Sequence, residues 1–147
     1  MRLRVRVPGV DVVYEITVLD DTGSDYLELF VDDCGHLGFN RHLIPAHLDC
    51  GYEDLVTVNG NIRVPTILVE VLVMATDNTP IGALFLVKAA LPDAWSFQRQ
   101  RCSGQGLKKG LVYRDAPGAF GAGNLYVGIN KSRIMKEKKN YYLQLPF

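Results

Sequence analysis

Apolar and polar residues alternate at the start of the chain. Residues 1–7 carry four apolar side chains on one face of a predicted strand and three arginines on the other. Charged side chains on an open strand face often protect the edge of a sheet, and we interpret the arginines in this way. Residues 66–74 and 81–87 are instead dense in branched apolar residues with little alternation. This pattern is typical of strands buried on both faces, so we expect these two segments to form the core.

Shorter patterns complete a mostly β prediction. Apolar segments at residues 12–18 and 26–31 predict two more strands. Residues 52–58 and 61–64 predict a hairpin. The Asn-Gly pair between them, at 59–60, is a strong signal for a type I′ turn.

Composition narrows the class of protein. The chain has 147 residues, is 48% hydrophobic and has a formal net charge of zero, which fits one globular domain spanning residues 1–147. Balanced charge gives no reason to expect nucleic acid as a partner, and no segment has the length and apolarity of a signal peptide or membrane span. Cys34, Cys50 and Cys102 cannot all pair within the chain, which favours a reducing, intracellular and cytoplasmic location.

The loop between the two strands near the N-terminus has the residues of a reactive site. Asp21 is the candidate reactive group, because it stands between β-rich segments in a turn that can surround one carboxylate with amides and hydroxyls. Thr22 can donate its hydroxyl to neighbouring backbone, Gly23 permits a close main-chain approach, and Ser24 can hold the carboxylate by a hydrogen bond. The alternative is an ordinary turn with a capping aspartate.

At these residues the sequence resembles the retropepsin-like aspartic proteases, the retroviral and retrotransposon-type family with the signature Asp-Thr-Gly-Ala/Ser after an apolar strand. The match covers Asp21-Thr22-Gly23-Ser24, and Asp25 extends it. The resemblance implies a mostly β, closed-barrel-like acid protease fold with one short helix near the C-terminus. It also implies a hairpin flap that closes over the substrate.

The resemblance further implies an aspartic endopeptidase that needs no cofactor or metal. Two carboxylates share one proton and activate a water, and this chain carries one matching loop. We therefore expect a homodimer with Asp21 from each copy, in which Thr22 braces the loops across the axis. Asp25 would contact the backbone of a peptide or protein substrate. Asp20 is an unusual second acid, and we expect it to point away from Asp21 because adjacent strand residues face opposite sides.

Two further positions are assigned through the resemblance. Tyr52 suits a flap that covers substrate, although a tyrosine at a strand end often packs on its own sheet. The tip of the flap is either the 59–60 turn or the corner at residues 50–52. Gly104 is the candidate glycine of a second loop packed beside the Asp21 loop, followed by a short helix at 108–113. Here the chain departs from the family, because Gln105 stands where retroviral enzymes carry an arginine.

The C-terminal part adds a softer resemblance. Residues 115–118 and 124–129 are similar to the ending of retropepsin-like domains encoded in fungal genomes. Residues 131–139 form a basic run that we interpret as solvated. Residues 141–147 alternate again and predict a last strand that could pair with its mate in a two-fold dimer.

Two other functions remain open. The chain could be a catalytically inactive relative that keeps the fold as a dimerisation or peptide-binding module. It could also be a small metal-binding β domain, since Cys34, His36, His47 and Cys50 are zinc-type ligands in one loop-rich stretch. Their spacing argues against zinc, because the stretch has no C-x-x-C pair and a proline interrupts any helix through it.

Overall fold

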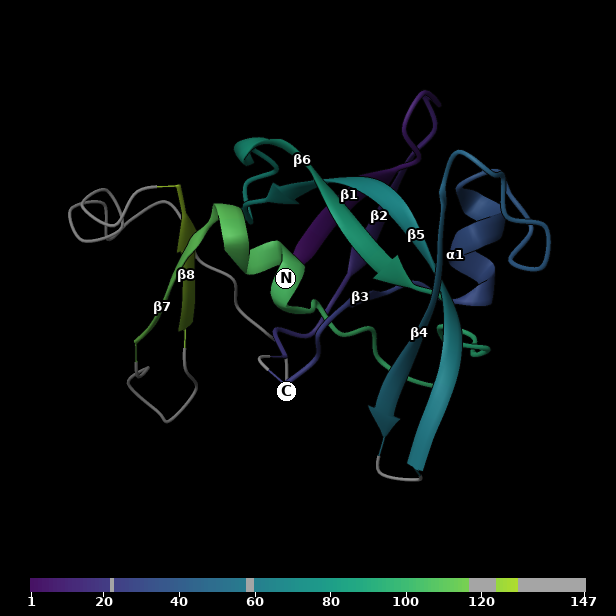
Figure 1. Ribbon diagram of the computed structural model, residues 1–147. Coiled ribbons are helices and arrows are strands. Elements are labelled where there is room, and N and C mark those ends of the chain that lie inside the picture. The colour runs from purple at the N-terminus through teal and green to yellow at the C-terminus, as the bar shows by residue number, and fades with distance from the viewer. Residues whose placement is uncertain (22, 58–59, 117–123, 130–147) are drawn as a thin grey trace.

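The computed structural model describes residues 1–21, 23–57, 60–116 and 124–129. The fold is mostly β, as predicted, and Figure 1 shows its strands and short helices. The strands are β1 (Arg2–Arg6), β2 (Val13–Thr17), β3 (Leu27–Glu28), β4 (Asp49–Thr57), β5 (Gly60–Met74), β6 (Pro80–Ala90), β7 (Val112–Ala116) and β8 (Asn124–Gly128). The helical segments are α1 (Val31–His36) and a 3₁₀ helix, η1 (Gln105–Gly110).

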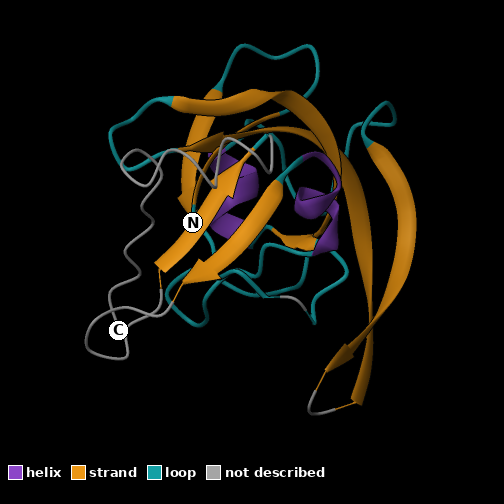
Figure 2. Cartoon of the chain, turned by 90° about the vertical axis from the view of Figure 1, so that its left-hand side faces the viewer, coloured by secondary structure: helices purple, strands orange, loops and turns teal. Residues whose placement is uncertain are grey.

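Six strands form the main sheet, in the order β2-β1-β5-β6-β3, with β4 paired to β5. The long strands curve strongly, as Figure 2 shows, but over the described residues this sheet does not close into a barrel. Strands β7 and β8 form a separate antiparallel pair. They contain residues 115–116 and 124–128 of the C-terminal segments singled out in the sequence. Residues 117–123 and the predicted last strand at 141–147 lie outside the described residues.

The core lies on one face of the sheet. In β5 the alternate residues Ile67, Val69, Val71 and Val73 are fully buried, while those between them are partly exposed. In β6 the expectation of burial on both faces is wrong, because Leu86 is 57% exposed. Leu84 of β6 is exposed as well, so this part of the strand meets solvent on its outer face.

The edge-strand interpretation of β1 is also wrong. Strand β1 pairs with β2 on one side and β5 on the other, so it lies inside the sheet. Its arginines are instead partners of acids on the neighbouring strands. Arg2 and Arg4 pair with Glu15 of β2, and Arg6 pairs with Glu70 of β5.

The helical segments differ from those expected. Helix α1 was not predicted, because its six residues include a glycine and two aspartates and show no apolar period. Its first turn is fixed by Asp33, whose Oδ2 accepts the Phe30 N–H at 2.8 Å. Near the C-terminus the short helix is η1, which begins at Gln105 rather than at residue 108.

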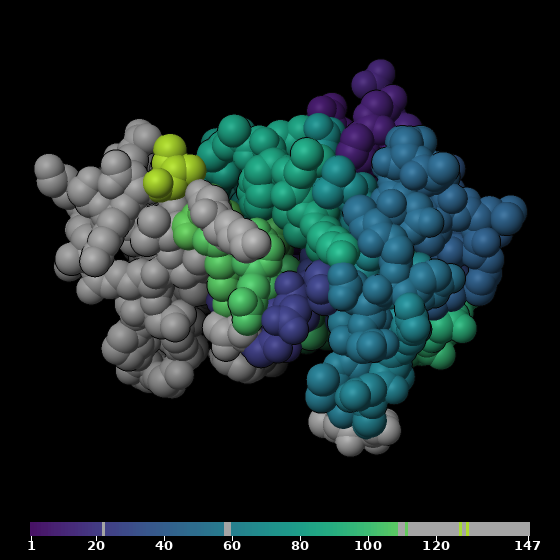
Figure 3. All heavy atoms as spheres, in the orientation of Figure 1, coloured from purple at the N-terminus to yellow at the C-terminus, as the bar shows by residue number. Residues whose placement is uncertain are grey.

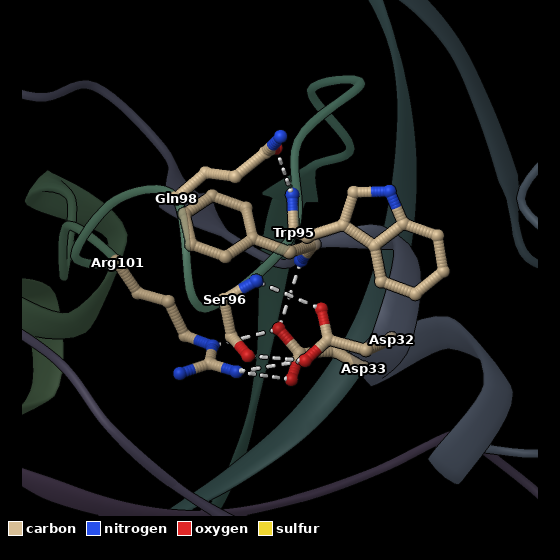
Figure 4. Close-up of polar contacts among 7 residues, drawn as sticks. Asp32, Asp33, Trp95, Ser96, Gln98 and Arg101 are labelled. Atoms are coloured by element: carbon tan, nitrogen blue, oxygen red, sulfur yellow. Dashed lines mark hydrogen bonds and ion pairs between the residues drawn. The ribbon is translucent and has the colours of Figure 1, made fainter.

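A buried ion pair ties helix α1 to the segment that precedes Gly104. Asp33 is fully buried, and the Arg101 guanidinium donates to both of its oxygens at 2.6 and 2.7 Å. Figure 4 shows Ser96 directed at the neighbouring Asp32, which accepts its amide and hydroxyl. Burial opposes ionisation of Asp32, yet the pKa of its carboxyl lies below the usual value because of these Ser96 bonds. Segment 94–101 is thereby anchored just before it reaches the Asp21 loop.

Replacing Arg101 by leucine should lower the free energy of unfolding by about 3–5 kcal/mol, because Asp33 would remain buried without its cation. Urea denaturation measures the difference. The control is Arg4→Leu, which removes an exposed pair with Glu15 and should cost no more than about 1 kcal/mol. A loss below about 1 kcal/mol for Arg101→Leu would contradict the proposed anchoring.

Candidate active site

The Asp21 loop is interlocked with residues 101–105. Leu19 forms a parallel bridge with Cys102, and its N–H donates to the Arg101 carbonyl at 2.8 Å. The Ser103 N–H donates to the Leu19 carbonyl at 2.9 Å. Further along, the Gln105 N–H donates to the Ser24 carbonyl at 2.9 Å. Backbone hydrogen bonds thus join two loops that are far apart in the sequence.

The Asp21 carboxylate is held by its own turn. The Gly23 N–H donates to Asp21 Oδ1 at 2.8 Å, and the Asp21 N–H donates to Ser103 Oγ at 3.3 Å. Ser24 does not bond this carboxylate, because its hydroxyl donates to the Tyr26 carbonyl at 2.9 Å. The role predicted for the Ser24 hydroxyl therefore needs correction: it stabilises the loop two residues away. Thr22 lies outside the described residues.

Gly104 makes the closest approach between the two loops. Its φ is +70°, in the region that favours glycine. A Cβ at this position would lie 2.2 Å from the Tyr26 carbonyl carbon and 2.5 Å from the Leu27 nitrogen. Both of these are backbone atoms, which cannot swing aside as a side chain does. No residue with a side chain fits here without moving the strand that follows the Asp21 loop.

A hollow of about 430 Å³ opens at Asp21. One wall is the loop itself, including Asp25, and the opposite wall is the β4–β5 hairpin, through Leu55, Val56 and Ile62. Figure 3 shows this hairpin projecting from the body of the molecule. A partly exposed carboxylate thus lines the same hollow as an apolar wall, in a space large enough for several side chains.

The two positions that the sequence offers for the flap tip lie at opposite ends of the hairpin. Thr57 of β4 pairs with Gly60 of β5 at the far end of the hairpin, next to the predicted Asn59-Gly60 turn. The corner at Cys50 is at the opposite end, where the pairing of β4 with β5 shifts register. Residues 58 and 59 themselves are outside the described ranges.

Tyr52 lies away from Asp21. Its side chain lines a different hollow, together with Arg41 and Asp49. It is 62% exposed, and the Arg63 guanidinium carbon lies 5.7 Å from its ring centroid. This placement matches the alternative of a tyrosine packing on its own sheet. In this conformation of the chain, Tyr52 and Asp21 belong to separate surfaces.

Asp20 and Asp21 point in different directions, as predicted. Asp20 Oδ1 accepts the Ser103 hydroxyl at 3.4 Å and pairs with Lys108 Nζ at 3.4 Å, and Asp20 does not line the Asp21 hollow. Asp25 does line it. Among the described residues Asp25 has no arginine partner, which agrees with Gln105 at the position where the family carries arginine.

Sequence reasoning missed three residues of the hollow, namely Glu28, Arg99 and Cys102. Glu28 was the detectable one, because it is a single charge within the apolar segment 26–31. The pKa of the Cys102 thiol is raised to about 12, first by burial, then by the charge of Glu28, and then by a hydrogen bond to Asp21 and the charge of that residue. A thiol with this pKa keeps its proton at neutral pH and is a poor nucleophile.

The metal-site alternative finds no geometric support. Over the described ranges, no three His, Cys, Asp or Glu side chains gather closely enough to hold a metal ion. Cys34 is buried and Cys50 is exposed, while His36 stacks on Tyr14 with ring centroids 4.4 Å apart. The helices of the described part include none long and apolar enough to cross a membrane.

In comparisons with known proteins, the chain has no significant match to a family model, a curated protein or a solved structure. The site is therefore interpreted from its own geometry and from the sequence motif.

Replacing Gly104 by alanine should separate the two loops and lower the free energy of unfolding by at least about 3 kcal/mol, because the new methyl group would meet backbone. Thermal or urea unfolding measures this. Gly35→Ala is the matched control, since a Cβ there meets nothing within 4 Å and its φ is not positive. The control should be neutral or slightly stabilising in helix α1. Equal effects of the two substitutions would disprove the packing described for Gly104.

The three thiols should also differ in reactivity. At pH 8 we expect an alkylating reagent to modify exposed Cys50 first, and Cys34 and Cys102 at least about a hundredfold more slowly, because a pKa of about 12 leaves little thiolate. Peptide mass spectrometry follows each site. Glu28→Gln removes one of the charges that raise the Cys102 pKa, so it should speed alkylation of Cys102 and leave Cys34 unchanged. Cys102 reacting as fast as Cys50 in the unsubstituted protein would contradict this assignment.

Proposed function

We propose that this chain is an aspartic-type endopeptidase of the retropepsin class, with an active site built from two copies that each contribute Asp21. The observation that carries the proposal is the position of the Asp21 carboxylate, which lies in a hollow opposite the β4–β5 hairpin. A peptide bound there would lie between a carboxylate and a covering hairpin, which is the arrangement that the sequence resemblance implies.

The packing of the second loop supports the same proposal. Gly104 lies against the strand that leaves the Asp21 loop, and the short helix η1 begins at the next residue. This agrees with the loop and helix that the resemblance places beside the catalytic aspartate. The closed-barrel-like fold of the family is part of the proposal, and the curved sheet with its long hairpin is compatible with it.

The need for a second chain follows from the chemistry. One carboxylate must be ionised to take a proton from water while another is protonated to polarise the scissile carbonyl. Asp20 is engaged by Lys108, and the second loop carries Ser103 and Gly104 where another acid would be needed. A two-fold dimer supplies the missing group as a second Asp21, and the two together titrate as a coupled pair.

Substrate binding would use both walls of the hollow. An extended peptide can hydrogen-bond through its main chain, while the apolar side chains of Leu55, Val56 and Ile62 receive its side chains. Asp25 lines the loop side of the hollow and would accept from backbone amides of the peptide. The partly exposed carboxylate of Asp21, one oxygen of which accepts the Gly23 N–H, would hold the attacking water.

The decisive experiment measures mass in solution and cleavage of pooled peptides from mildly acidic to neutral pH. We expect a dimer whose activity falls by at least about a thousandfold in Asp21→Asn, because the coupled carboxylates are lost while the fold is kept. Asp20→Asn is the control, since it removes the adjacent carboxylate that faces Lys108, and it should retain cleavage. A folded monomer that cuts no peptide would refute the proposal and favour a peptide-binding module instead.

A further inference from the structure

Ser103 places a buried hydroxyl between two neighbouring aspartates. The residue is fully buried, and its Oγ accepts the Asp21 N–H at 3.3 Å. The same hydroxyl donates to Asp20 Oδ1 at 3.4 Å. The backbone bonds between the two loops end at Leu19 and Ser24, on either side of the turn. The Ser103 hydroxyl therefore extends the contact between the loops to the main chain of Asp21 itself.

Only one direction of the hydroxyl proton satisfies both neighbours of Ser103. A backbone N–H can only donate, an ionised carboxylate can only accept, and a serine hydroxyl has a single proton. The proton must therefore point to Asp20, which leaves the lone pairs of the hydroxyl oxygen for the Asp21 N–H. Asp20 thus orients the hydroxyl, and the hydroxyl in turn holds the amide of Asp21.

Asp20 is itself held by a cation. Its Oδ1 lies 3.4 Å from Lys108 Nζ, and both side chains are mostly buried. Lys108 belongs to η1, the short helix that begins directly after Gly104. A line of polar contacts therefore runs from η1 through Asp20 and Ser103 to the backbone of Asp21. Removing the Ser103 hydroxyl would break this line and take the acceptor away from the Asp21 amide.

We propose that Ser103 is a positioning residue, whose hydroxyl fixes the amide of Asp21 and so the direction in which the catalytic carboxylate points. The inference rests on the proposed function in treating Asp21 as catalytic. Ser103 is not among the residues that line the hollow, so it acts through Asp21 and not on the substrate. Two Asp21 carboxylates share one proton only when both turns hold the same geometry, and a displacement of about 1 Å can cost about a hundredfold in rate.

Steady-state kinetics of Ser103→Ala test the inference, with a peptide that the unsubstituted protein cleaves. We expect kcat to fall about thirtyfold because the Asp21 amide loses its acceptor, and KM to stay within about twofold because the walls of the hollow are unchanged. Thr66→Val is the matched control, since it removes another fully buried hydroxyl, which donates to the Gly51 carbonyl at 3.0 Å. It should lower the urea midpoint by a similar amount and leave kcat within about twofold of the original value.

A double-mutant cycle tests the orientation of the hydroxyl by Asp20. Asp20→Ala frees the hydroxyl to rotate, so kcat should fall about fivefold, but by less than about 1.5-fold when Ser103→Ala is already present. Asp20→Asn keeps an oxygen that accepts from the hydroxyl, which agrees with the cleavage expected of that variant. If Ser103→Ala does not fold, the comparison of Asp20→Ala with Asp20→Asn decides, and equal kcat values in these two variants would overturn the inference.

The two proposals fail separately. A kcat for Ser103→Ala within about twofold of the original value, or an equal fall in Thr66→Val, would overturn the role of Ser103 and leave the protease supported. If the unsubstituted protein cleaves no peptide, the proposed function fails, and hydrogen exchange of the Asp21 amide then decides on Ser103. Exchange at least about tenfold faster in Ser103→Ala than in Thr66→Val would support the Ser103 contact, and equal exchange would overturn it.

Discussion

The structure depends on one close contact between backbones, where Gly104 meets the main chain of Tyr26 and Leu27. Because a methyl group has no room there, the two loops can approach until their amides and carbonyls bond directly. Those bonds hold Leu19 on one side of the Asp21 turn and Ser24 on the other, and so fix where the turn begins and ends. The geometry of a candidate catalytic group is thus set by the absence of a side chain some eighty residues away in sequence.

The ion pair between Arg101 and Asp33 is a second constraint, and it supports the first. Gly104 lies three residues after Arg101, whose guanidinium bonds the buried carboxylate of Asp33. A buried pair of this kind contributes little net free energy but penalises any other arrangement heavily, since either charge alone would be stranded. The pair therefore acts on position: it holds the second loop where Gly104 can meet the strand beyond Asp21.

Local patterns predicted the parts of the fold that local chemistry determines. The hairpin was predictable because an Asn-Gly pair lies between two β-rich segments, whereas the register shift near Cys50 was not, because it depends on how β4 pairs with β5. The exposure of Leu86 was not predictable, since it depends on whether another layer covers β6. Helix α1 was missed for a similar reason, because the aspartate that caps its first turn pairs with an arginine from far along the chain.

The residues of the candidate site likewise include some that local patterns predicted and some that they did not. Asp21 was found from four neighbouring residues, and Gly104 from the resemblance that they established. Glu28 and Arg99 were missed because their pairing joins residues more than seventy positions apart. An acid within an apolar strand indicates that a cationic partner exists, but the sequence alone does not say which cation pairs with it.

The length of β5 has a mechanical consequence. This single strand of fifteen residues forms the hairpin wall at one end and lies in the core, between β1 and β6, at the other. Residues 60–63 of β5 are exposed and burial begins at Val64, so the hairpin end projects while the rest of the strand is held in the sheet. Movement of the β4–β5 hairpin over a peptide would bend strands that are already ordered instead of ordering a flexible loop. The conformational entropy lost on closing would then be small, and elastic bending of the sheet would set the cost.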